Sequence, residues 1–77
     1  MRAVRPEEVM KILELTDSLN LHREKVFIPL KTEANGTTTL QSDGRVRIGC
    51  PEHGVSEQWL KQLRIELEAI MARSRVN

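Results

Sequence analysis

The sequence predicts an α+β fold of two layers, in the order α-β-β-β-α, with a three-stranded antiparallel meander that packs one face against two helices. The stretch Phe27–Cys50 alternates between apolar and polar residues, which is the pattern of half-buried strands. Two glycine turns, Asn35-Gly36 and Asp43-Gly44, divide this stretch into three strands. Segments with apolar residues at helical spacing precede and follow this stretch. The simplest way to bury one apolar sheet face and two helical stripes is to pack both helices on that face, which gives two layers.

The register of the meander depends on the length of its two turns. With two-residue turns, Leu30 would face Gln41, and Leu40 would lie on the polar face. With three-residue loops, each a type I turn followed by glycine at positive φ, the apolar residues share one face. Register follows the hydrophobic pattern, so we expect bulged three-residue turns. The expected inner rows are Leu30, Leu40 and Val46, and then Thr32, Thr38 and Ile48.

The opposite face of the predicted sheet is polar and mildly basic. Lys31, Thr39 and Arg47 fall in one cross-strand row of this register, and Arg45 lies at the second turn. These four residues form the predicted binding face. Antiparallel sheets often leave one face in water, and threonine is common in strands, so a merely solvated face is the alternative.

The first helix is expected to begin at Pro6, which is favourable in the first turn, and to end near Asn20. Glu7 and Glu8 suit the positive end of the helix dipole. For residues 21–25 the sequence allows either a last helical turn or a polar loop. The apolar stripe is Val9, Ile12, Leu13, Thr16 and Leu19, widened by Met10 and Leu15.

The second helix is expected to begin after Ser56, a favourable N-cap, and to run to about Ala72. Ile65 points away from its apolar stripe and is either simply exposed or part of a dimer contact. The stripe itself consists of Trp59, Leu60, Leu63, Leu67, Ile70 and Met71.

Length and charge set the class of protein. Seventy-seven residues form a single domain, 1–77, of marginal stability, with residues 1–5 and 73–77 expected to be frayed. The net charge of +1 argues against a strong electrostatic hold on nucleic acid or membranes. The single cysteine and the lack of a long apolar run or a signal peptide predict a cytoplasmic protein without a membrane partner.

No residue constellation predicts catalysis, a cofactor or a metal. Cys50 and His53 have a Cys-x-x-His spacing, but a structural zinc site needs four ligands, and only His22 remains. The same pair could serve as nucleophile and base, yet it lacks an orienting third group. The alternative is that Cys50 packs at a strand end as a small hydrophobe.

Several short segments resemble the HicA toxin family, small bacterial proteins with the α-β-β-β-α fold of double-stranded-RNA-binding domains. The similar segments are Glu8–Leu13, Gly44–Ile48, Val55-Ser56 and Leu60–Leu63. The resemblance implies that fold. The family's catalytic histidine, in a Gly-Ser-His-like segment, has no counterpart within Phe27–Cys50.

The resemblance also bears on RNA binding. RNA-binding domains of this fold carry a lysine cluster at the start of the second helix, where this chain has Glu57, Gln58 and only Lys61. A nucleic-acid surface would therefore consist of Lys31, Arg45, Arg47 and Lys61.

Three functions follow from these observations, in order of preference. The first is a small non-enzymatic protein that acts as a regulatory, accessory or inhibitory factor through contacts with a protein partner or with a second copy. The second is weak binding of RNA or DNA through the basic outer face. The third is a degenerate ribonuclease toxin.

Overall fold

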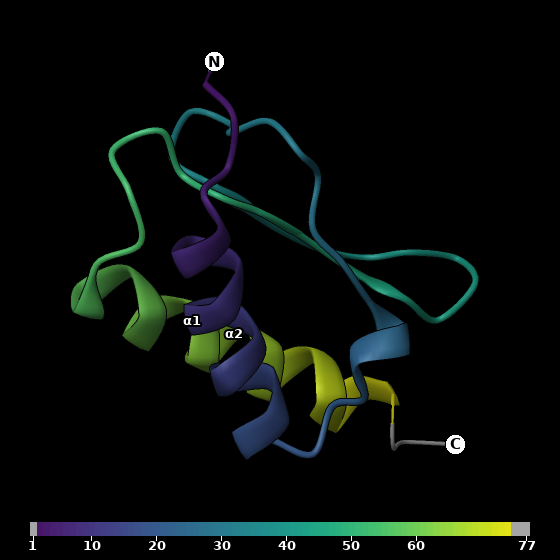
Figure 1. Cartoon of the computed structure of the whole chain (residues 1–77). Coiled ribbons are helices and arrows are strands. Elements are labelled where there is room, and N and C mark those ends of the chain that lie inside the picture. The colour runs from purple at the N-terminus through teal and green to yellow at the C-terminus, as the bar shows by residue number, and fades with distance from the viewer. Residues whose placement is uncertain (1, 75–77) are drawn as a thin grey trace.

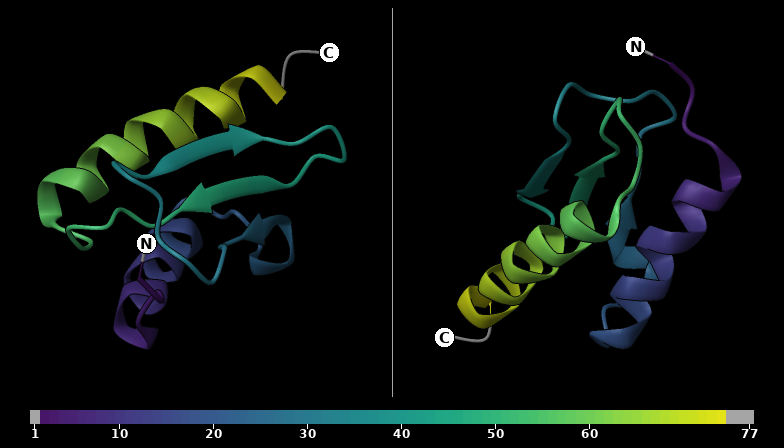
Figure 2. Two further views of the ribbon diagram at one scale, coloured as in Figure 1. Left: turned by 90° about the horizontal axis from the view of Figure 1, so that it is seen from above. Right: turned by 90° about the vertical axis from the view of Figure 1, so that its left-hand side faces the viewer.

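The computed structural model describes residues 2–74 and shows an α+β domain of two layers (Figure 1). Helix α1 (Pro6–Ser18) is followed by a short 3-10 helix, η1 (Arg23–Lys25), and by strand β1 (Val26–Phe27). Strands β2 (Thr37–Leu40) and β3 (Val46–Gly49) and helix α2 (Glu57–Ser74) complete the domain. The predicted order of elements and the fold class are confirmed. Both helices lie on the same side of the sheet, which leaves its other face open (Figure 2).

The sheet is mixed and is not the predicted antiparallel meander. Its strand order is β1-β3-β2, with β1 parallel and β2 antiparallel to β3. The central position goes to β3, the most deeply buried strand, in which Val46 and Ile48 belong to the core, whereas β2 is largely exposed. A strand composed of three threonines and one leucine is better suited to the edge of the sheet, where it has one neighbouring strand and remains exposed to water on its other side.

The second hairpin has the predicted register and turn. Leu40 pairs with Val46, and Thr38 pairs with Ile48. The Gln41 N–H donates to the carbonyl of Arg45 at 2.7 Å, which closes a three-residue loop. Gly44 ends that loop at φ 90°, and Gly44 N–H donates to the Gln41 carbonyl at 3.0 Å. The bulged type I turn is therefore confirmed at this site.

The first turn keeps the predicted local geometry but does not join paired strands. Gly36 has φ 84°, and its N–H donates to the carbonyl of Glu33 at 2.6 Å. The segment before this turn pairs elsewhere: Lys31 forms an antiparallel bridge with Ala3. Leu30 is consequently 87% exposed, and its predicted place in an inner row is wrong.

The N-terminal residues were expected to be frayed, but residues 2–4 are tied to the domain. The Val4 N–H donates to the Leu30 carbonyl at 2.8 Å, and the Thr32 N–H donates to the Arg2 carbonyl at 2.8 Å. At the other end, Arg73 still belongs to α2. The expectation of fraying at Met1 and at 75–77 lies outside the described residues.

Both helices follow their sequence signals. Asn20 has φ 61°, the left-handed conformation that ends a helix, and α1 stops just before it. The Ser56 Oγ accepts the Trp59 N–H at 3.1 Å and so caps α2. Of residues 21–25, which the sequence left open, Arg23–Lys25 form η1, and Arg23 Nη2 lies 2.8 Å from Asp17 Oδ2 of α1 in an exposed ion pair. The core consists of Ile12, Val46, Ile48, Cys50, Val55, Leu63, Leu67 and Ile70.

Candidate functional site

The open face of the sheet carries one exposed aromatic side chain in a row with polar ones. Phe27 pairs with Arg47, and Arg47 pairs with Thr39, so the three residues cross the sheet side by side. Partners in a ladder point to the same face, and this row alternates with the buried row of Val46. Phe27 is 47% exposed because neither helix covers this side of the sheet (Figures 1 and 2). We call Phe27, Thr39, Arg45 and Arg47 the outer-face patch.

The two arginines of the outer-face patch are paired with carboxylates. Arg47 Nη1 lies 2.6 Å from Glu33 Oε1 and also donates to Thr37 Oγ1 at 3.2 Å. Arg45 Nε lies 3.7 Å from Asp43 Oδ2. The patch therefore offers little uncompensated positive charge, although it is rich in hydrogen-bonding groups.

The structure brings only part of the predicted binding face together. Thr39 and Arg47 share a row, and Arg45 lies at the turn of the same hairpin. Lys31 does not join them, because its segment bridges to Ala3 instead of pairing with β2. Lys61 is exposed on α2, in the helical layer on the other side of the sheet. The four cations proposed for nucleic acid therefore do not form one surface.

Phe27 was missed as a surface residue because its partner strand was assigned wrongly. In a meander, β1 would lie beside β2, and Phe27 would stand at the start of an edge strand. The signal that could have located it is the contrast between the apolar residues of β3 and the threonines of β2, which favours β3 as the central strand.

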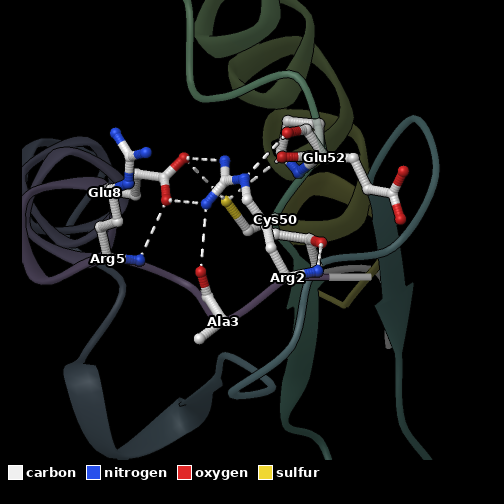
Figure 3. A network of polar contacts seen from close by, with 8 residues as sticks. Arg2, Ala3, Arg5, Glu8, Cys50 and Glu52 are labelled. Carbon is white, nitrogen blue, oxygen red and sulfur yellow. Dashed lines mark hydrogen bonds and ion pairs between the residues drawn. The ribbon is translucent and has the colours of Figure 1, made fainter.

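A partly buried polar network at the N-terminus was not predicted from the sequence (Figure 3). Arg2 Nη1 and Nη2 donate to Glu8 Oε1 and Oε2, each at 2.7 Å, and Arg5 N–H donates to Glu8 Oε1 at 3.0 Å. Glu8 is only 6% exposed. The side-chain hydrogen bonds from Arg2 hold the pKa of Glu8 at about 2, against an ordinary value of 4.5, although burial opposes this shift. Cys50 Sγ lies 3.6 Å from Glu8 Oε2 and closes the network.

The network is a structural clamp and offers no reactive group. Burial is the largest cause that raises the pKa of the Cys50 thiol, from 9.0 to about 11, and the Glu8 carboxylate adds to it. Such a thiol is protonated at neutral pH and is a poor nucleophile. His53 is exposed in the loop after it. Within residues 2–74, no three His, Cys, Asp or Glu side chains are placed to hold a metal ion.

Comparisons with protein-family models, with curated proteins and with solved structures give no match. No helix in the described part of the chain is both long and apolar enough to span a membrane. The resemblance to the HicA family stays a prediction.

Proposed function

We propose that this chain is a small non-enzymatic binding protein that acts on a protein partner through the outer-face patch. The observation that carries the proposal is Phe27, a half-exposed aromatic residue beside Arg47 on a sheet face that neither helix covers. Aromatic and arginine side chains contribute most of the energy in many protein interfaces. A regulatory, accessory or inhibitory role in the cytoplasm fits a chain of this size whose one thiol is free and buried.

The charges of the patch favour a protein over a nucleic acid. A phosphate group would have to displace Glu33 from Arg47, and Asp43 from Arg45. A protein surface can instead hydrogen-bond to these pairs and to Thr39 while it covers Phe27. One observation favours the second candidate, weak binding of RNA or DNA: Phe27 beside Arg47 provides an aromatic ring on which a base could stack.

The test is partner capture with matched variants. Immobilised wild-type chain, Phe27→Ser and Ile65→Ser are used to isolate proteins from source-cell extract, and each recovered partner is then titrated in purified form. Ile65, which is 61% exposed on α2, serves as the control because it lies in the helical layer. We expect Phe27→Ser to weaken binding by about tenfold or more and Ile65→Ser to leave it unchanged.

Two further results decide between the candidates. Light scattering of the free chain shows whether the partner is a second copy. Titration with a short duplex and a single-stranded RNA at low salt tests the alternative. Binding of RNA that weakens as salt rises and that requires Phe27 would replace the protein proposal. Equal partner binding by Phe27→Ser and wild type would reject the outer-face patch.

A further inference from the structure

The free edge of β2 differs from the outer-face patch and has its own binding groups. Hydrogen bonding alternates along an antiparallel ladder, and the Gln41–Arg45 pair at the turn is hydrogen-bonded. Thr39 and Thr37 therefore bond to β3, whereas the N–H and C=O groups of Thr38 and Leu40 point outward. Within residues 2–74, β3 is the only strand that pairs with β2.

This edge lacks the features that usually prevent strand pairing. Edge strands are commonly protected by lysine, proline or a bulge. The segment Thr37–Leu40 contains no charged residue and no proline, and its four residues pair with β3 without interruption. The edge therefore presents four backbone groups in a regular extended conformation.

A recess runs beside this edge, between β2 and α2. It has a volume of about 140 Å³ and is lined by Thr37 and Thr38 on one side and by Trp59, Gln62 and Glu66 on the other. Its end is fixed, because Trp59 Nε1 donates to the Asn35 carbonyl at 3.2 Å. The one charged group of the recess is the carboxylate of Glu66, whose Oε2 accepts the Thr38 hydroxyl at 3.4 Å.

We propose that the β2 edge binds an extended peptide segment of a partner protein, with a lysine or arginine side chain of that segment in the recess beside Glu66. A peptide residue paired with Thr38 points to the same face as Thr38, toward Glu66. The residue paired with Leu40 also points to that face, where Leu40 is 44% exposed. The recognised segment thus has a basic and an apolar residue two positions apart.

The charge of the recess also decides against a second copy as the occupant. The strand that a second copy would offer at this edge, Thr37–Leu40, contains no cation to meet Glu66. The inference goes beyond the proposed function, because it uses a different surface and a different form of the partner, an extended segment.

The test uses a displayed library of random nine-residue peptides selected on the immobilised full chain. Trp59, the only tryptophan, lines the recess and reports binding by its fluorescence. We expect enrichment of a basic and an apolar residue two apart. Glu66→Lys is expected to lower the affinity for the selected synthetic peptides by about tenfold or more. Glu68→Lys is the control, since it makes the same change on another side of α2, where Glu68 pairs with the exposed Arg64. Its affinity for the peptides is expected to stay within about twofold of wild type.

Methylation of the peptide backbone tests the strand geometry. Alternate amides of an added strand donate to the edge, so N-methylation at every second position is expected to abolish binding, and methylation at the intervening positions to preserve it. No enrichment, equal binding to Glu66→Lys, or insensitivity to N-methylation would overturn the inference.

The same peptides separate this inference from the proposed function. Phe27→Ser is expected to bind them like wild type. Loss of peptide binding in Phe27→Ser would place the peptide on the outer-face patch and overturn the edge site. Phe27-dependent capture of a partner without any peptide binding would leave the proposed function standing and reject the edge site alone.

Discussion

At the residue scale, Glu8 is the side chain on which the N-terminal segment depends. It joins Arg2 to the start of α1 and contacts Cys50 at the end of β3. Neutralising one partner of a largely buried pair leaves the other undercompensated, so we expect Glu8→Gln to lower the free energy of unfolding by about 1–3 kcal/mol. For a domain of this size, each kcal/mol of lost stability lowers Tm by about 4–8 °C. Glu7→Gln, an exposed neighbour, is the control in urea and thermal unfolding.

The same residue sets a pH dependence. The folded pKa of Glu8, about 2, lies below its ordinary value of 4.5, so its contribution to stability is present above the ordinary value and is lost as pH falls toward 2. The difference in unfolding free energy between wild type and Glu8→Gln is therefore expected to be constant from pH 7 to about 5 and to shrink below that. A difference that grows on acidification would contradict the ion pair with Arg2.

Cys50 gives a second prediction at this scale. A rise of its pKa from 9.0 to about 11 lowers the thiolate fraction about a hundredfold, and burial blocks access as well. Native protein at pH 8 is expected to react with a thiol reagent at least about a hundredfold more slowly than protein in urea. A native rate like that of a free thiol would contradict the buried placement of the cysteine.

At the scale of elements, the two glycine turns look alike in sequence but have different surroundings. Gly36 and Gly44 both have positive φ, and replacing glycine by alanine in this conformation costs about 1 kcal/mol of stability. An added Cβ at Gly44 meets nothing within 4 Å, whereas at Gly36 it would lie 2.8 Å from Trp59 Nε1 and 2.9 Å from the Gly49 carbonyl oxygen. Gly36→Ala is expected to cost at least about 1 kcal/mol more than Gly44→Ala. Urea unfolding followed by Trp59 fluorescence measures both, and equal losses would show that Trp59 does not pack against this turn.

The elements that could be predicted are those formed by nearby residues. α1, α2 and the hairpin of β2 and β3 follow from caps, apolar spacing and a turn at Gly44, all of which act over a few residues. β1 could not be placed in this way. The alternation of Ile28 and Leu30 resembles a strand, yet β1 has only two residues and pairs with β3, whose residues lie about twenty positions later.

At the scale of the whole molecule, the order of the strands determines which surfaces exist. With β3 at the centre, Phe27 stands beside Arg47 on the open face, and β2 has a free edge above the recess of α2. The antiparallel meander would have placed β2 at the centre and removed that edge. In the observed strand order Lys31 bridges to Ala3, whereas Arg47 pairs with Phe27, so a continuous basic face does not form.

The sequence by itself determined the fold class, the starts of both helices, the bulged turn at Gly44 and the core stripe of α2, because helix caps, turn residues and apolar periodicity act locally. Only the tertiary structure decided the strand order, the burial of Glu8 against Arg2, and the positions of Phe27 and Glu66 at the two proposed surfaces. The strand order depends on pairing across twenty residues, and Arg2 is placed beside Glu8 by the pairing of the N-terminal segment with residues 30–32. The choice among such pairings rests on which strand buries the most apolar surface and on which charges can meet once the chain is packed.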